Sequence, residues 1–343
     1  MKIRDIRNEL PGVRLLNAAD CEPRAVDWLW GNWLPEEAIT ILAGAPGTGK
    51  TTIALSIAAI VSRAGIWPDQ SKCAQNHNVI IWSGEDDVEA TLLPRLIAMG
   101  ANLRNIHFVT QINDRGRHRD FDPSADMNHL VVKLTEIGGA GLIIIDPVIS
   151  VISGDSNQAG VVRDGLQVLQ SMARSGIAVL GITHFSKSGK TTRSPLERVI
   201  GSQAFAALAR VVWVTAKGGN ENRVFARAKN NLGPDGGGYE YIVSTSQIAD
   251  GIEASMIRWG DYLEGDAESI LNGVEQAESV PTRIDEAKAF LCGILTSESR
   301  VSANEILGRA KQDGHSLSTI NRAKRELQIR VEKDGSGGWF WRL

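Results

Sequence analysis

From Ala38 onwards, short apolar runs alternate with longer segments in which apolar residues recur at helical spacing. Uninterrupted apolar runs are typical of strands buried on both faces, and the 3.6-residue period is typical of amphipathic helices. The alternation of the two predicts right-handed βαβ units and a mostly parallel sheet, which is an α/β fold. The predicted strands are 38–43, 79–82, 106–110, 142–145 and 177–182, and the predicted helices are 51–63, 88–99, 125–137 and 161–174.

Beyond residue 200 the same domain continues with a helix at 203–209, a strand at 211–215 and a hairpin of 224–229 and 239–243 across a Gly/Pro-rich turn. The pattern divides the chain into a mixed N-terminal segment (1–35), an α/β domain (36–262), a linker (263–280) and a second unit (281–343). The linker has weak apolar periodicity and many acidic and amide side chains, and we expect some helix in it. The second unit has three short helices at 283–295, 303–312 and 316–327, then two short strands, which is the outline of a winged helix.

The composition changes this picture little. Hydrophobic residues make up 43% of the chain and charged residues 22%, as in an ordinary folded protein. A net charge of −3 excludes a protein that binds nucleic acid through bulk positive charge, although a local basic site stays open. Three scattered cysteines predict no disulfide framework and a reducing, cytoplasmic location. No apolar run approaches the roughly 20 residues of a membrane span, so no membrane partner is expected.

Three of the nine tryptophans, Trp28, Trp30 and Trp33, crowd the end of the N-terminal segment. We expect them to cover the core, and the N-terminal segment to pack on the core or on a neighbouring subunit. The alternative is an aromatic packing beside a nucleotide base.

The strongest motif is a glycine-rich loop that fits GxxxxGK[ST] and lies between a predicted strand and an alanine-rich helix. Its glycines let successive backbone N–H groups point at phosphates, its lysine adds a point charge, and its threonine hydroxyl binds Mg²⁺. The predicted ligands are therefore ATP and Mg²⁺. The alternative interpretation of the motif is an ordinary strand-to-helix turn. The predicted nucleotide-binding residues are Gly44, Ala45, Pro46, Gly47, Thr48, Gly49, Lys50, Thr51 and Thr52.

Acidic residues follow two of the predicted strands. Asp146 ends the apolar run 142–145 and is predicted to hold the metal together with Thr51, although Asp also favours turns. In many P-loop ATPases a glutamate directly follows this aspartate and serves as the general base. Here Pro147 occupies that position, so the general base must come from another segment. Glu85, just after strand 79–82, is predicted to orient the attacking water. The alternative is a helix N-terminus enriched in acids, which Asp86 and Asp87 also fit.

A third strand, 177–182, ends in Thr183 and His184. Either side chain could contact the γ-phosphate and pass its presence to the loop that follows, and we favour His184. The alternative is a polar strand end without a role in catalysis.

Together the segments GAPGTGKT, SGEDD, LIIIDP, GITHFSKSG and RAKNNLGP resemble the RecA/DnaB-type ATPases. Within that class the similarity is greatest to RepA-type hexameric helicases of plasmids and related ATPases of phages and integrated elements, over about residues 25–245. The resemblance implies a RecA-like core, Glu85 as catalytic base and His184 as sensor. It also implies basic residues that complete the site of an adjacent subunit. Arg227 and Lys229 are the candidates, in reversed order relative to DnaB-type helicases, and Arg210 is a third.

Two regions are predicted to contact DNA. The loop 185–200 carries Lys187, Lys190, Arg193 and Arg198 against one acid, directly after the sensor, where RecA-like rings hold single strands; a solvated loop is the alternative. The unit 281–343 has 11 basic and 8 acidic residues. Its third helix carries Arg322, Lys324 and Arg325, which fit a major groove, while protein interaction is the alternative. The basic cluster 115–119 has no predicted role.

The resulting hypothesis is an ATP-driven, homo-oligomeric ring, a hexameric helicase that moves on single-stranded DNA during replication of a mobile element. A replication initiator or a primase would be its partner. The alternatives are a RecA/KaiC-like DNA-binding ATPase that does not unwind DNA, and a DNA-binding regulator controlled by nucleotide.

Overall fold

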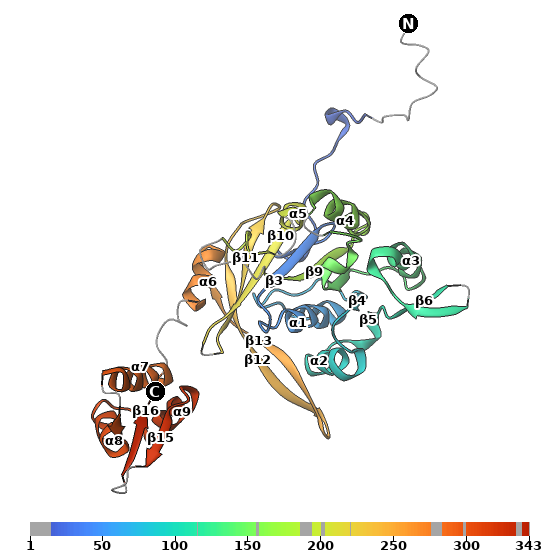
Figure 1. Cartoon of the computed structure of the whole chain (residues 1–343). Helices are drawn as coiled ribbons and strands as arrows, with labels where there is room; N and C mark the ends of the chain where they lie inside the picture. The colour runs from blue at the N-terminus through green and yellow to red at the C-terminus, as the bar shows by residue number, and fades with distance from the viewer. Residues whose placement is uncertain are drawn as a thin grey trace.

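The computed structural model describes residues 15–114, 116–155, 158–185, 194–199, 203–219, 221–275, 283–297, 300–333 and 338–342 (Figure 1). Within these residues a nine-stranded sheet carries helices on both faces, and the predicted α/β fold with a RecA-like P-loop core is confirmed. The strands of this sheet are β3 (Ile39–Gly44), β4 (Val79–Ser83), β5 (Ile106–Phe108), β8 (Leu142–Asp146), β9 (Ala178–His184), β10 (Val211–Lys217), β11 (Arg223–Asn230), β12 (Gly238–Ala249) and β13 (Ile252–Leu263).

The strand order is β13-β12-β11-β10-β3-β9-β8-β4-β5. From β10 to β5 all neighbouring strands are parallel, as the βαβ pattern predicts. Beyond β10 the sheet continues with antiparallel pairs, which the hairpin prediction anticipates for β11 and β12. Because carboxyl ends of parallel strands share one edge, the ends of β3, β4, β8 and β9 meet there.

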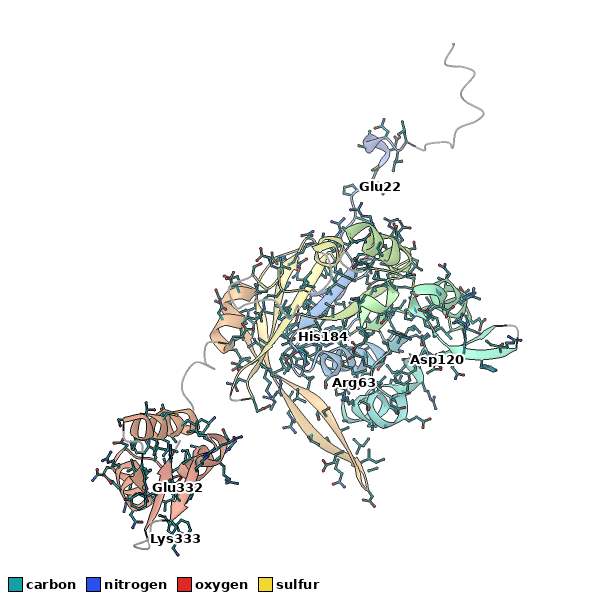
Figure 2. All side chains as sticks on the ribbon, in the orientation of Figure 1. Glu22, Arg63, Asp120, His184, Glu332 and Lys333 are labelled. Carbon is teal, nitrogen blue, oxygen red and sulfur yellow. The ribbon has the colours of Figure 1, made fainter. Side chains whose placement is uncertain are left out.

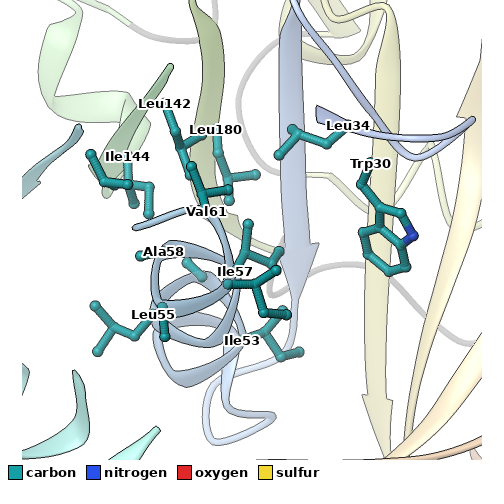
Figure 3. Packing of buried hydrophobic residues seen from close by; sticks show 14 of the residues in the cluster. Trp30, Leu34, Ile53, Leu55, Ile57, Ala58, Val61, Leu142, Ile144 and Leu180 are labelled. Atoms are coloured by element: carbon teal, nitrogen blue, oxygen red, sulfur yellow. The ribbon is translucent and has the colours of Figure 1, made fainter. Parts of the chain in front are cut away.

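Two apolar layers enclose the parallel strands. In β3, Leu42 points to one layer while Ile41 points to the other, as the period-2 alternation of a strand requires. The layer of Leu42 is closed by α1 (Lys50–Arg63) and α2 (Leu93–Ala98), and Figure 3 shows α1 against this face. The opposite layer is closed by α3 (Pro123–Glu136), α4 (Ala159–Arg174), α5 (Gln203–Leu208) and α6 (Ala267–Glu275).

The tryptophan-rich hairpin of β1 (Trp28–Trp30) and β2 (Leu34–Pro35) packs on the α1 side of the sheet. Trp30 is fully buried and stacks between Trp33 and Trp67, with ring centroids 4.9 and 5.1 Å away. Phe225 and Tyr239 complete the cluster. Trp30 and Trp33 are thus buried among these rings and cover the core as predicted, whereas Trp28 is half-buried.

The structure differs from the sequence prediction at polar strands and in the predicted linker. The hairpin of β6 (Gln111–Asp114) and β7 (Arg117–Asp120) and the long strand β13 were not predicted. Residues 263–275, expected in a linker, end β13 and form α6, which buries Ile270 and Leu271 against the sheet. The main domain therefore extends to Glu275.

The C-terminal unit has its own apolar core, which contains Leu291, Ile306, Ile320 and Trp341. Its three helices lie where they were predicted. The two predicted terminal strands, β15 and β16, are present, and the short strand β14, which was not predicted, completes a three-stranded sheet in the order β14-β16-β15. Figure 2 marks Glu332 and Lys333 at the end of β15. The elements are α7 (Arg283–Ser297), β14 (Val301–Ser302), α8 (Ala303–Gln312), α9 (Leu317–Glu326), β15 (Arg330–Lys333) and β16 (Trp339–Arg342).

Among the described residues, no helix is both long enough and apolar enough to cross a membrane.

Candidate active site

The phosphate loop connects the end of β3 to the start of α1, at the edge of the sheet where the parallel strands end. Gly47 and Gly49 have φ angles of 78° and 91°, in the left-handed region that glycine adopts without strain. At Gly44 a Cβ would lie 2.1 Å from Thr215 Oγ1, so this glycine is required by close approach of β10. Glycines therefore shape the loop at its entry, middle and exit.

Lys50 is buried at the N-terminus of α1 and reaches back across the loop. Its Nζ donates hydrogen bonds to the carbonyl oxygens of Gly44 (3.1 Å) and Ala45 (3.0 Å). Burial lowers its pKa to about 8, and nearby Asp146 and Glu85 oppose that shift. A phosphate group in the loop would favour the charged ammonium, so the site is built to bind an anion.

Thr51 and Asp146 supply the donors that a magnesium ion would use. The Thr51 hydroxyl donates to Asp146 Oδ2 at 2.6 Å, which holds two hard oxygen atoms together beside the loop. Burial raises the pKa of Asp146 to about 6. A hydroxyl and a carboxylate beside phosphate oxygens fit Mg²⁺, which prefers a few protein oxygens and keeps several waters.

Glu85 and His184 face each other across the same edge of the sheet. His184 Nδ1 lies 3.2 Å from Lys50 Nζ, and His184 Nε2 lies 3.9 Å from Glu85 Oε1. Burial lowers the pKa of His184, and the charge of Lys50 lowers it further. Glu85 is exposed, as a residue that orients water must be. Figure 2 marks His184 at the centre of the domain.

These contacts place four of the predicted catalytic residues in one cluster: Lys50, Glu85, Asp146 and His184. The two acids that follow Glu85 fit the alternative interpretation, in which acidic residues mark the N-terminus of a helix. Asp87 caps the π-helical turn η3 (Val88–Leu92), and Asp86 pairs with Arg95. Thr183, the second sensor candidate, is buried at the end of β9.

Two residues that support the loop were not found from the sequence. The Thr215 hydroxyl lies 2.8 Å from that of Thr48, and the Tyr241 hydroxyl donates to the Thr48 carbonyl at 2.6 Å. Thr215 lies in the buried strand β10 and Tyr241 in the mixed strand β12, and the only available signal is a hydroxyl at a buried position. Thr48 is thereby fixed from β10 and β12.

The candidates for a contact with an adjacent subunit differ in their surroundings. Arg227 is buried, donates to the Asn32 carbonyl at 2.6 Å and lies over the Trp33 ring, 4.5 Å from its centroid. These contacts hold its guanidinium inside its own chain, so we favour the other two candidates for the trans role, which stays a prediction. Lys229 donates to the Ala209 carbonyl at 2.8 Å, and Arg210 is exposed.

The residues predicted to contact DNA are also placed unequally. Lys187, Lys190 and Arg193 lie outside the described residues, whereas Arg198 is paired with Glu275 inside the protein. In α9, Arg322 pairs with Glu326, Lys324 lies over the Trp341 ring, and Arg325 is exposed. In the cluster 115–119, Arg119 binds the buried carboxylate of Asp126 and so has a structural role.

The loop between a buried strand and a helix, with its lysine, threonine and strand-end aspartate, defines a P-loop ATPase. An AAA domain family matches residues 7–190, more than half of the chain, and the chain belongs to this family of ATPases. The family implies that the protein binds a nucleotide and typically uses Mg²⁺. No curated protein matches the chain.

Proposed function

We propose that the protein is a DNA-dependent ATPase that assembles into a ring, a hexamer in our hypothesis, and translocates on single-stranded DNA as a helicase. The observation that carries this proposal is the cluster of Lys50, Glu85 and His184, which lie at the start of α1, just after β4 and at the end of β9. The loop 185–200, which contains Lys187, Lys190 and Arg193, begins at Phe185, immediately after His184 in the sequence. A γ-phosphate that contacts both Lys50 and His184 would thus influence the position of the chain that continues into the basic loop.

Within this proposal each residue has one role. Lys50 and the backbone of the phosphate loop bind the phosphates, and Thr51 and Asp146 hold Mg²⁺, which neutralises charge on the phosphate oxygens. Glu85 orients the attacking water, and His184 senses the γ-phosphate. We propose Lys229 or Arg210 as the cation supplied to an adjacent subunit. Such a cation makes hydrolysis depend on assembly.

The deciding experiment measures ATP hydrolysis with and without single-stranded DNA, and then strand displacement on forked duplexes of both polarities. Lys50→Ala should abolish nucleotide binding. Glu85→Gln should retain binding and lose hydrolysis, by about 10²-fold or more for the loss of a general base. Hydrolysis stimulated by DNA without displacement of either strand would replace the helicase with a translocating or switching ATPase that does not unwind DNA.

The trans contact has its own test. Lys229→Ala subunits are mixed with Lys50→Ala subunits, and the ATPase rate is measured against the mixing ratio. Recovery above both pure variants would support a contact between subunits, because some interfaces then combine an intact P-loop with an intact Lys229. A rate that never exceeds the sum of the two pure variants would contradict it. Arg210→Ala is tested in the same way.

A second candidate function is favoured by the C-terminal unit, which has a core of its own and a basic third helix. We propose it as a winged helix that binds duplex DNA, in which case the nucleotide would control assembly at a chosen site. Duplex binding that is lost in Arg322→Ala/Arg325→Ala while the ATPase rate stays unchanged would support this function.

A further inference from the structure

Arg198 and Glu275 form an enclosed, two-fold hydrogen-bonded ion pair far from the phosphate loop in sequence. Arg198 Nη1 donates to Glu275 Oε2 at 3.0 Å and Nη2 donates to Oε1 at 2.7 Å, and the side chains are only 12% and 15% exposed. The partners are 77 residues apart, one near the end of the basic loop 185–200 and the other at the end of α6. This geometry fixes the orientation of the guanidinium as well as its position.

The same guanidinium lies over the ring of Phe185, 4.4 Å from its centroid. Phe185 is buried, donates its backbone N–H to the Gly44 carbonyl at 3.1 Å, and forms an antiparallel bridge with Val199. The residue that directly follows His184 is therefore held between the start of the phosphate loop and Arg198. Arg198 is in turn held by α6.

We propose that Arg198 and Glu275 are positioning residues for ATP hydrolysis, which fix Phe185 and thereby the His184 imidazole between Lys50 and Glu85. The inference rests on the proposed role of His184 at the γ-phosphate. It assigns to α6, a helix on the opposite face of the sheet from α1, an influence on the active site through Arg198 and Phe185.

Stability alone does not explain the choice of an ion pair at this position. Enclosed ion pairs add little net stability relative to apolar residues of the same size, because both charges lose their hydration. A carboxylate that grips a guanidinium through two bonds does supply a defined orientation. Small errors in the position of a catalytic group reduce rates strongly, by up to about 10²-fold for 1 Å.

The test compares Glu275→Gln with Glu268→Gln, an exposed acid on the same helix, in the full-length protein. We measure kcat, KM for ATP, affinity for a fluorescent ATP analogue and the thermal midpoint. Glu275→Gln should lower kcat about tenfold while KM and analogue affinity stay within about twofold, because the phosphate loop keeps its own contacts. Glu268→Gln should change none of these quantities. Arg198→Lys keeps the charge but loses the paired bonds, and should also lower kcat.

A kcat within twofold of wild type in both Glu275→Gln and Arg198→Lys would overturn the proposal, whatever the thermal midpoints. If Glu275→Gln does not fold, Arg198→Lys alone decides. His184→Asn separates the two levels of inference. If it lowers kcat and the Arg198 and Glu275 variants do not, only the positioning role fails. If His184→Asn is as active as wild type, the proposed sensor fails, and the positioning role falls with it.

Discussion

At Gly44 the end of β3 leaves no room for a side chain. A Cβ would lie 2.1 Å from Thr215 Oγ1 and 2.8 Å from the Thr215 carbonyl oxygen. Gly44→Ala should therefore destabilise the protein by about 2 kcal/mol, as overpacking of a well-packed interior does. It should also weaken ATP binding, because the strained atoms belong to the phosphate loop. Urea denaturation and nucleotide titration measure the two effects.

The matched control for Gly44→Ala is Gly160→Ala in α4, where an added Cβ would meet no atom within 4 Å. It should be neutral or stabilise by up to about 1 kcal/mol, because alanine favours helix. Thr215→Ala in the Gly44→Ala background should recover part of the lost stability, since it removes one of the two clashing oxygens. No loss of stability in Gly44→Ala would contradict the close approach of β3 and β10.

Asp146 makes the stability of the nucleotide-free protein depend on pH. Burial raises its pKa from 3.8 to about 6, so the folded protein favours the protonated, neutral carboxyl group; this contribution to stability is fully present below pH 4 and is lost as the pH rises through 6 and the group ionises. Asp146→Asn keeps a side chain of the same shape without the charge. It should stabilise the apo protein by up to about 3 kcal/mol at pH 8, at 1.4 kcal/mol per pKa unit, and by much less at pH 4.

The measurement for Asp146→Asn is urea denaturation between pH 4 and 8 without metal or nucleotide. Mg²⁺ with ATP should then stabilise the wild type more than the variant, because the ion needs the charged carboxylate whereas the phosphate loop is unchanged. A stability difference that is equal at pH 4 and pH 8 would show that the charge of Asp146 is not the cause.

The site residues that could be predicted from the sequence are those that belong to a motif or lie at the end of an apolar strand. Lys50 and Thr51 lie in a loop pattern, and Asp146 and His184 end apolar runs, so their meeting at one sheet edge follows from parallel pairing. Arg198 has no such mark. In the sequence it is one more basic residue of a basic loop, and its carboxylate partner is 77 residues away. Contacts of this kind depend on the tertiary fold.

At the scale of elements, Trp30 is the largest fully buried side chain by which the β1–β2 hairpin packs on the sheet. Trp30 is fully buried, contacts the rings of Trp33 and Trp67, and donates its Nε1–H to Asp69 Oδ2 at 3.0 Å. Trp30→Ala should cost about 4 kcal/mol of unfolding free energy, the range for a large aromatic removed from a core. Trp339→Ala, on the exposed side of β16, should cost less than about 0.5 kcal/mol.

Denaturant unfolding followed by circular dichroism measures both tryptophan variants, so that the loss of a fluorophore does not distort the result. Equal stabilities of Trp30→Ala and Trp339→Ala would contradict a core role for the hairpin. Arg227 also contributes to the packing of the hairpin, because its guanidinium lies on the Trp33 ring. An alanine at Arg227 should therefore lower stability as well as any activity.

Buried helices and strands were predicted more accurately than exposed ones. Strands such as β8 are apolar on both faces and were predicted within a residue of their ends. All residues of β7 are exposed, and β13 mixes polar and apolar residues along its length, so neither showed a clear period. α6 presents a narrow apolar stripe of Ala267, Ile270 and Leu271 among polar residues, so its weak periodicity and its acidic and amide side chains predicted a linker with some helix.

For the whole molecule, charge is divided between its parts. Residues 1–280 contain 26 basic and 32 acidic residues, whereas 281–343 contain 11 and 8. A near-neutral chain can thus carry a basic unit, and affinity for DNA would then fall steeply with added salt. Affinity would also depend on assembly if several copies contact one strand.

The boundary of the ATPase domain can be tested by truncation. The structure places α6 in this domain, with Ile270 and Leu271 buried and Glu275 bound to Arg198. A chain of residues 1–275 should therefore fold and bind ATP as the full chain does. A chain that stops at residue 262, the boundary expected from composition, exposes the apolar surface under α6. It should lose several kcal/mol, since burying each large aliphatic side chain contributes about 1.5–3 kcal/mol.

Thermal denaturation and ATP titration compare the two truncations, with the full chain as reference. Equal stability and equal activity of 1–262 and 1–275 would contradict the assignment of α6 to the ATPase domain. The complementary fragment 276–343 contains a complete core around Leu291, Ile306, Ile320 and Trp341, so it should unfold cooperatively by itself. Its stability should be small, because a domain of this size buries only about 60% of its surface. A fragment that shows no cooperative transition would mean that the C-terminal unit depends on contacts with the rest of the protein.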